Sequence, residues 1–341
     1  MSTEPFNVLW LQAGSCGGCT MAALGVEDVG IVAAMEQAGL RFLWHPALSE
    51  ETGREAISIL EDAAAGRVRL DALCVEGSIM RGPNDTGRFH MVGGTGLSMA
   101  EWVRRLAAQA RYTVAVGTCA TFGGIPAGGL NPTDSCGLQY DNDHAGGLLG
   151  AHYRSGEGLP VVNVAGCAPH PGWIAETLLA LAAGEIGEVD LDLHARPRFF
   201  ADHLAHHGCS RNEFYEFKAS AERFSDRGCL MENLGCKATQ AVGDCGQRVW
   251  NGAKGACPDA GYSCVACTMP GFENPGSAFM ETPKVAGVPV GLPVDMPKAW
   301  FIALAALSKS ATPERVRSNA RTDHVRMPPA RKKAQITKDR A

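Results

Sequence analysis

No lysine or arginine occurs in this sequence before Arg41. A secretory signal needs a positively charged start and a twin-arginine signal needs its two arginines, so neither export signal is expected. The longest apolar helical run near the end of the chain, residues 299–307, has nine residues, which is too short to span a bilayer. These absences predict a cytoplasmic protein that stays off the membrane and keeps its thiols reduced.

The motifs of several common enzyme classes are also missing. The sequence has no P-loop, no G-x-G-x-x-G turn after a strand, no nucleophile elbow and no internal repeat. Aromatic residues make up only 7% of the 341 residues, whereas glycine occurs 41 times, which suits an α/β protein rich in loops. Hydrophobic residues make up 45% and charged residues 20%, which predicts a globular chain with one large or two ordinary domains.

Cysteine, in contrast, is abundant. The chain has 13 cysteines, and seven of them lie between Cys209 and Cys267. A secreted disulfide scaffold is usually short and evenly rich in cysteine, whereas clustered cysteines in a long globular chain more often bind metal. The cysteine pattern therefore predicts metal centres rather than disulfides.

The first half of the chain alternates short apolar strands with helical stretches. We predict strands at 7–12, 40–44, 70–75, 112–116 and 160–164, and helices at 28–37 (with Asp28 as N-cap), 50–64, 98–109 and 172–181. This alternation predicts an α/β fold whose parallel sheet carries helices on both faces. After about His194 cysteine, glycine and proline dominate, so this part is expected to be largely irregular and held by metal, with a last helix at 296–308.

These patterns divide the chain into three parts: residues 1–190, 191–308 and 309–341. The last part holds ten Lys or Arg and three acidic residues, a net charge of +7 (10 − 3), while the whole chain carries −5. Its composition predicts a basic, partly disordered tail, which is either a solvated end without a role or a docking arm for a protein. Nucleic acid is not expected as a partner, because the acidic body would repel phosphate and no aromatic residues interleave the charges.

Four cysteines follow three of the predicted strands. Their spacing is Cys16-x2-Cys19-x99-Cys119-x47-Cys167, and ligands of parallel sheets bind at the carboxyl ends of the strands. Four thiolates can hold a zinc ion or an iron–sulfur cluster. Zinc sites usually consist of two close pairs on local turns, so the dispersed spacing favours a cluster; buried structural cysteines are the alternative.

Two further sets of four possible ligands lie in the cysteine-rich part. His206 and Cys209 are three residues apart and would share one side of a helical turn, and Cys229 and Cys236 could complete their set. The other set is Cys245, Cys257, Cys264 and Cys267, which ends in a C-x2-C pair and taken alone could also hold zinc. Cys74 and Cys136 remain and are predicted to be structural. Three clusters in one chain would form a path for electrons.

The sequence resembles the small subunit of the [NiFe] hydrogenases from about Asn7 to Ser310. The resemblance lies in SCGGCT, GTCATFGG, VAGCAPHPGW, HHGC, GCLMENLGC and the final C-x2-C. It implies a flavodoxin-like domain followed by a cluster-binding domain. It also implies three sets of ligands: Cys16, Cys19, Cys119 and Cys167 for a proximal [4Fe-4S] cluster, Cys245, Cys264 and Cys267 for a medial cluster, and His206, Cys209, Cys229 and Cys236 for a distal [4Fe-4S] cluster.

Two departures from the family pattern concern these ligands. Many members have proline near the position of Cys257 and a three-iron medial cluster, so a fourth thiol here implies a medial [4Fe-4S] cluster. Cys229 and Cys236 are separated by six residues instead of five, an insertion that a loop can absorb. The resemblance further implies a [NiFe] centre in a separate large subunit, with this chain passing electrons outward. Glu76 is a candidate polar group near the proximal site; otherwise it is an ordinary loop carboxylate.

Within the family, the stretches EGSIMRGPNDTGRFH, NPTDSCGLQY and NEFYEFKASAE are most similar to the cytoplasmic regulatory hydrogenases, which sense hydrogen. This implies a heterodimer that signals to a sensor histidine kinase, with the kinase or a second heterodimer docking on the C-terminal tail. The alternatives are a cytoplasmic uptake hydrogenase, an iron–sulfur electron-transfer subunit without hydrogen chemistry as in quinone-reducing respiratory complexes, and an interaction protein held together by zinc.

Overall fold

A computed structural model describes residues 4–27, 30–250, 252–276, 279–290, 292 and 297–321. The chain forms two compact units, each built from several segments. The sheet unit consists of Met1–Cys209, Lys237–Ala256 and Cys264–Ala278, and the second unit consists of Ser210–Cys236, Cys257–Ser263 and Phe279–Ala341.

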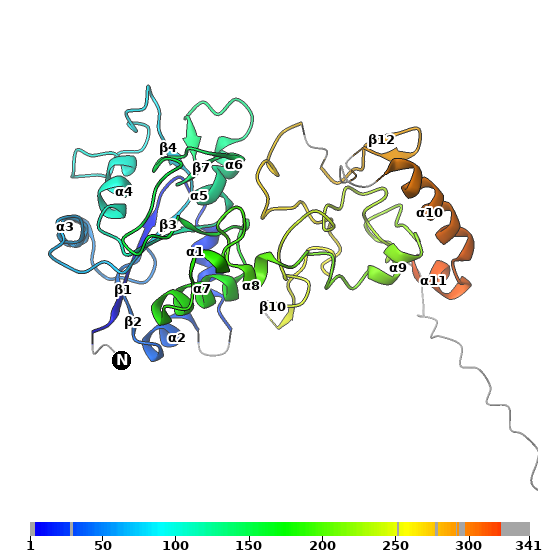
Figure 1. Cartoon of the computed structure of the whole chain (residues 1–341), viewed down its shortest axis with the longest axis horizontal. Helices are drawn as coiled ribbons and strands as arrows, with labels where there is room; N and C mark the ends of the chain where they lie inside the picture. The colour runs from blue at the N-terminus through cyan, green and yellow to red at the C-terminus, as the bar shows by residue number, and fades with distance from the viewer. Residues whose placement is uncertain are drawn as a thin grey trace, which may run out of the picture. The chain divides into compact units, whose positions relative to one another are not determined.

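The sheet unit is built on five parallel strands in the order β2-β1-β3-β5-β9. Figure 1 labels β1, β2 and β3 of this sheet. Their bounds are β1 Phe6–Gln12, β2 Leu40–Trp44, β3 Ala72–Glu76, β5 Tyr112–Val116 and β9 Val162–Val164. Because β4 pairs with β6 in a separate two-stranded sheet, this is the order of a flavodoxin-like sheet. The central strands β3 and β5 are buried at every residue, as expected for strands covered on both faces. The predicted α/β fold is confirmed.

Helices cover both faces of the sheet, and each face has its own apolar core. On one face lie α1 (Gly18–Leu24), α2 (Ile31–Gln37) and α7 (Pro171–Ala183). On the other face lie α3 (Gly53–Ala64) and α4 (Met99–Ala107). Successive strand residues alternate between these cores, because strand side chains point to opposite faces.

Among the described α-helices, only α4 and α7 begin with a side chain that caps the first turn. Ser98 caps α4, and its hydroxyl accepts a hydrogen bond from the backbone nitrogen of Glu101 at 3.2 Å. The helix predicted at 28–37 begins at Ile31 instead, and Gly30 precedes it with a φ of 74°. Asp28, its predicted N-cap, lies outside the described residues.

Short elements fill the rest of the sheet unit. They are β4 (Ile79–Met80), α5 (Thr118–Phe122), α6 (Gly124–Ala127), β6 (Ser135–Cys136), β7 (Tyr140–Asp141), β8 (His144–Ala145), the 3-10 turn Glu188–Asp190, α8 (Arg198–Ala201), β10 (Val249–Trp250) and β11 (Ala253–Lys254).

The second unit is largely irregular, as predicted. Its described elements are α9 (Asn212–Glu216), β12 (Lys284–Val285), β13 (Val288–Pro289), α10 (Lys298–Ala311) and α11 (Glu314–Asn319). Side-chain bonds to backbone hold its loops: the Arg211 guanidinium donates to the carbonyls of Asp226 and Gly228 at 2.8 and 2.7 Å. Among the described residues, no helix has the length and apolar character that crossing a membrane requires.

Candidate metal centre

The first cysteine pair lies where the loop after β1 leads into α1. This loop is fixed to the end of β3, because Gly14 and Ser78 exchange two backbone hydrogen bonds of 2.9 and 3.1 Å. Gly17 turns the chain with a φ of 79°, a backbone conformation that glycine adopts without strain. Cys16 therefore stands before the helix and Cys19 in its first turn.

The other two cysteines of this set reach the same edge from β5 and β9. Cys119 is the second residue of α5, directly after β5, and Cys167 follows β9. The thiols of Cys119, Cys167 and Cys16 each act electrostatically on that of Cys19. The structure thus brings together all four residues of the predicted proximal set at the carboxyl edge of the sheet.

Two glycines leave room around these sulfur atoms. A Cβ at Gly124 would lie only 2.8 Å from the sulfur of Cys119, and a Cβ at Gly117 would collide with the sulfur of Cys19. Both glycines have positive φ values, 54° and 89°, which favour glycine. The space around these sulfur atoms therefore requires glycine at positions 117 and 124, and we call these two residues the glycine cradle.

The environment of the thiols favours a positively charged occupant. Burial, followed by the charge of Cys167, raises the pKa of Cys119 to about 12. Burial also raises the pKa of Cys19 and of Cys167, and the charge of Cys16 adds to the effect in both cases. Thiolates crowded in this way need neighbouring positive charge to be stable. The iron atoms of a [4Fe-4S] cluster, which four Cys thiolates can hold, meet that need.

Glu76 supports the cysteine loop from the end of β3, near the first set as the sequence suggests. Its side chain is fully buried. The carboxylate accepts hydrogen bonds from the Trp10 indole at 3.3 Å, the Ser15 hydroxyl at 2.6 Å and the Thr20 backbone nitrogen at 3.0 Å. Its charge also acts on the Cys19 thiol. It is therefore a buried anion beside the site and not an ordinary loop carboxylate.

Sequence reasoning missed a second acidic side chain near this set. Glu273 is half-buried, its Oε2 has no hydrogen-bond partner among the residues that the structure describes, and burial raises the pKa of its carboxyl. Its charge acts on the thiols of Cys119 and Cys167. Because Glu273 is more than 100 residues from either cysteine, spacing alone offered no signal for it.

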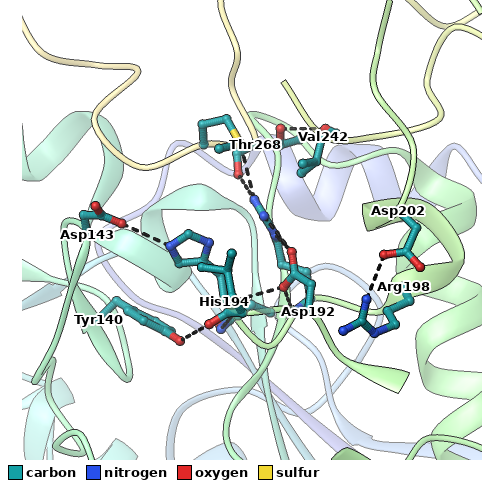
Figure 2. A network of polar contacts seen from close by, with 12 residues as sticks. Tyr140, Asp143, Asp192, His194, Arg198, Asp202, Val242 and Thr268 are labelled. Atoms are coloured by element: carbon teal, nitrogen blue, oxygen red, sulfur yellow. Dashed lines mark hydrogen bonds and ion pairs between the residues drawn. The ribbon is translucent and has the colours of Figure 1, made fainter. Parts of the chain in front are cut away.

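A network of polar contacts includes Thr268, the residue after the Cys264-x2-Cys267 segment, and sequence reasoning missed it as well (Figure 2). Arg196 is only 1% exposed and forms a double hydrogen bond with Asp192, at 2.8 and 2.6 Å. It also donates to the carbonyl oxygen of Thr268 at 2.9 Å. In the same network, His194 contacts Asp143 at 3.1 Å.

The other two predicted sets are each divided between the two units. The sheet unit contains His206, Cys209, Cys245, Cys264 and Cys267, and the second unit contains Cys229, Cys236 and Cys257. Both sets therefore remain predictions from the sequence.

Contacts within each unit describe the surroundings of these residues. The backbone nitrogen of Cys209 donates to the carbonyl of His206 at 3.1 Å, which is the turn that their spacing predicts. In the second unit, burial raises the pKa of Cys257, and the charge of Cys236 adds to the effect.

Cys74 and Cys136 are fully buried outside these sets, as predicted for structural residues. Among the residues that the structure describes, no group of three or more His, Cys, Asp or Glu side chains could hold a single metal ion. A [4Fe-4S] cluster makes a different demand, because each of its iron atoms takes one ligand from the protein.

Two protein families match parts of the chain. Residues 16–181 match the family described as NADH ubiquinone oxidoreductase, 20 Kd subunit. Residues 202–280 match the family described as the C-terminal part of the NiFe/NiFeSe hydrogenase small subunit. The second match covers part of the cysteine-rich region, including the predicted distal and medial ligands.

Whole-chain relatives agree with these matches. The chain is 30% identical over 323 residues to the F420 non-reducing hydrogenase II small subunit of Methanosarcina mazei, covering 89% of this chain and 82% of that protein. It is 31% identical over 288 residues to the periplasmic [NiFeSe] hydrogenase small subunit of Desulfomicrobium baculatum, covering 80% and 86%.

A solved structure of the actinobacterial-type NiFe-hydrogenase from Ralstonia eutropha is similar with a TM-score of 0.74 and 30% identity, over 92% of this chain and 93% of that chain. A [NiFeSe] hydrogenase from Desulfovibrio vulgaris Hildenborough is similar with a TM-score of 0.69 and 27% identity, over 82% and 99%.

Proposed function

This chain belongs to the small subunits of the [NiFe] hydrogenases, and from that premise we propose that it carries three [4Fe-4S] clusters in a hydrogen-sensing heterodimer. Small subunits of this family carry iron–sulfur clusters, transfer electrons and pair with a large catalytic subunit. The observation that supports the proposal most directly is the meeting of Cys16, Cys19, Cys119 and Cys167 beside the glycine cradle. Iron–sulfur clusters held by the predicted ligand sets would supply one-electron redox chemistry.

The chain's own residues hold and tune the proximal site. Cys16 lies in the β1–α1 loop, which Gly14 fixes to Ser78, and Cys19 lies in the first turn of α1. The buried Glu76 carboxylate adds negative charge near Cys19. Negative charge favours the oxidised form of an adjacent redox centre and lowers its potential.

His206 would act in the opposite direction at the distal set. A neutral imidazole in place of a thiolate removes one negative ligand, which raises the potential of a cluster. A lower potential at the proximal set and a higher one at the distal set would direct electrons away from the large subunit and toward His206.

Apolar side chains near the proximal cysteines offer a surface for the large subunit. Met21 on α1 is 70% exposed, Ile125 on α6 is 60% exposed, and Leu130 is fully exposed. α1 also carries Cys19, and α6 directly follows the helix that carries Cys119. Exposed apolar residues gathered around a functional site often mark a protein interface, and docking here would place the partner beside the first electron acceptor.

The sensing role rests on the sequence stretches that resemble the regulatory hydrogenases. Under this proposal the protein is cytoplasmic and signals to a sensor histidine kinase. The basic tail would contact the kinase or a second heterodimer; most of it lies outside the described residues. A cytoplasmic uptake hydrogenase is the alternative within the family.

The decisive experiment is anaerobic purification of the chain together with whatever binds it. We expect a co-purifying large subunit, nickel and iron in the complex, broad absorbance near 400 nm and hydrogen-dependent reduction of a dye. Cys119→Ala should lower the iron content, whereas the control variant Cys136→Ala, at a buried cysteine of the sheet unit outside the predicted sets, should not. Equal iron loss in both variants would contradict the proposed ligand set.

The same experiment decides the second candidate, an electron-transfer subunit without hydrogen chemistry. The match of residues 16–181 to the 20 Kd oxidoreductase family favours that candidate. It predicts iron and the 400-nm absorbance, but neither nickel nor hydrogen-dependent dye reduction.

A further inference from the structure

One threonine connects segments that carry ligands of two different predicted clusters. Thr118, the residue before Cys119, is only 1% exposed. Its hydroxyl accepts a hydrogen bond from the backbone nitrogen of Gly166 at 2.9 Å and donates one to the carbonyl oxygen of Cys267. Gly166 precedes Cys167, so a single side chain joins two proximal ligand segments to the C-x2-C segment of the medial set.

Thr268, the residue that follows the Cys264-x2-Cys267 segment, is held by further hydrogen bonds (Figure 2). The carbonyl of Thr268 accepts a hydrogen bond from the buried Arg196 at 2.9 Å, and the Thr268 hydroxyl donates to the carbonyl of Val242 at 2.7 Å. Asp192 balances the charge of Arg196 through two hydrogen bonds. The carbonyls of Cys267 and Thr268 and the hydroxyl of Thr268 are thus all hydrogen-bonded. These bonds leave the segment little freedom to shift relative to the end of β5.

We propose that Thr118 is a positioning residue that fixes the proximal and medial ligand segments relative to each other and completes a bonded route between them. The inference rests on the proposed function, because it takes Cys119 and Cys267 as ligands of separate clusters. The route runs from Cys119 through the peptide bond to Thr118, across its hydroxyl to the carbonyl of Cys267. One electron leaves a reduced proximal cluster and is taken up by an oxidised medial cluster, and no proton or bond moves with it.

Electrons tunnel more readily along covalent and hydrogen bonds than through empty space, so loss of the hydroxyl should slow this step. Thr118→Val keeps the shape of the side chain and removes both hydrogen bonds, whereas Thr118→Ser keeps the hydroxyl. Thr121→Val is the matched control, because Thr121 lies in the same helix, is equally buried, and among the described residues its hydroxyl bonds only to the carbonyl oxygen of Gly117, at 3.0 Å. Thr118→Ala provides a second variant without the hydroxyl in case valine does not fit.

The test uses the anaerobic complex with the large subunit. Iron content is measured first, then the magnetic coupling between the reduced proximal and medial clusters by EPR, and then the rate of medial reduction after mixing with hydrogen and rapid freezing. We expect slower medial reduction, by several-fold, and altered coupling in the valine and alanine variants. Thr118→Ser and Thr121→Val should match the wild type. Selective loss of the medial cluster from the valine and alanine variants would also support the positioning role.

Two results would overturn the inference. One is wild-type coupling and wild-type transfer in both variants that lack the hydroxyl. The other is loss of all clusters from those variants while the Thr121→Val protein keeps its clusters. Thr118 would then be needed for folding in general and not for the connection between the proximal and medial ligand segments. A wild-type complex without a medial cluster would instead refute the proposed function, so the two failures are distinguishable.

Discussion

The backbone nitrogen of Thr20 donates a hydrogen bond of 3.0 Å to the carboxylate of Glu76, which ties the residue after Cys19 to the end of β3. The Thr20 hydroxyl donates to the same oxygen atom. Both residues are buried, and a buried carboxylate that accepts several hydrogen bonds is held firmly in place. The position of α1, which carries Cys19, therefore depends on the side chain of Glu76, 56 residues after Thr20 in the chain.

Replacing Glu76 by Gln should loosen this connection and alter the proximal site. The amide of Gln keeps one acceptor oxygen, which can face the Trp10 indole and the Thr20 backbone nitrogen, because both donate to the same oxygen of Glu76. The amide nitrogen then replaces the other oxygen, so the hydroxyl of Ser15 loses its acceptor. We expect a loss of stability of about 1 to 3 kcal/mol and a higher potential of the proximal cluster, measured by urea unfolding and by redox titration with EPR. Glu36→Gln removes the same charge from an exposed helix residue and should change neither quantity. A lower potential in Glu76→Gln would contradict the predicted role.

His45 should make the protein sensitive to mild acid. Burial lowers the pKa of His45 to about 4, and the charge of Glu76 opposes this only in part. An unfolded His titrates near about 6.5, so between these values the unfolded state binds a proton that the folded state does not. Stability should therefore be complete above about pH 6.5 and fall by about 3 kcal/mol as the pH drops to 4.

His45→Phe should remove this acid sensitivity. Phenylalanine keeps the aromatic contacts with Trp10 and Phe42, which lie 5.0 and 5.2 Å away between ring centres. It loses the hydrogen bond from the backbone nitrogen of Ala47, at a cost of about 1 kcal/mol. The measurement is the urea midpoint at pH 7.5 and pH 5. Exposed His152 serves as the control, and His152→Gln should keep the wild-type acid dependence. An equal fall in both variants would refute the role of His45.

The sequence could predict the sheet because its strands are continuous apolar runs. The strands at 40–44 and 112–116 have the predicted bounds, and β1 begins only one residue earlier, at Phe6. Helix α5 was not predicted, because it has five residues and glycines with positive φ at both ends. Helix α11 was not predicted either: it has a single large apolar residue, Val316, whose complete burial results from tertiary packing.

The proximal ligands could likewise be predicted, because each follows a strand that ends at the same edge of the sheet. The groups that support them could not. The contact between Thr118 and Cys267 joins residues 149 positions apart, and a threonine before a cysteine carries no sequence signal of such a partner. Arg196 reads as an ordinary surface charge until its burial beside Asp192 is seen.

His206, and not His207, should ligate the distal cluster. The ring of His207 already accepts a hydrogen bond from the backbone nitrogen of Leu204 at 3.4 Å. His206→Ala should therefore change the EPR signal of the distal cluster, whereas His207→Ala should leave it unchanged and cost at most about 1 kcal/mol of stability. The reverse pattern would show that the ligand assignment is wrong.

Deleting residues 322–341 should weaken association without affecting electron transfer. The deletion begins after α11, because Val316 and Ala320 are buried and the carbonyl of Ala320 accepts a hydrogen bond from Gly228 at 2.8 Å. The removed segment holds six Lys or Arg and two acidic residues, and a basic arm speeds protein association in a salt-dependent way. We expect normal dye reduction and weaker binding to the kinase or a second heterodimer at low salt.

The control for this deletion is a full-length chain with the six basic residues replaced by Gln. It should reproduce the loss of binding if charge is responsible. Light scattering after size exclusion and a kinase pull-down, each at low and high salt, would measure the effect. Unchanged assembly and kinase binding in the truncated protein would mean that the tail has no docking role.

Cys257→Pro should convert the medial cluster to a three-iron form. Proline has no ligand atom in its side chain, so only the thiolates of Cys245, Cys264 and Cys267 would remain for that set. The substitution leaves the carbonyl of residue 257 in place, which accepts hydrogen bonds from Ala260 and Tyr262 at 3.1 and 3.0 Å, so the local turn should persist. We expect a new three-iron EPR signal in the oxidised protein and a loss of one iron per complex, and Cys257→Ala should behave in the same way. Cys136→Ala is the control and should keep the wild-type spectrum. An unchanged spectrum in both Cys257 variants would show that this thiol is not a ligand, because a cysteine outside the cluster can be replaced without altering it.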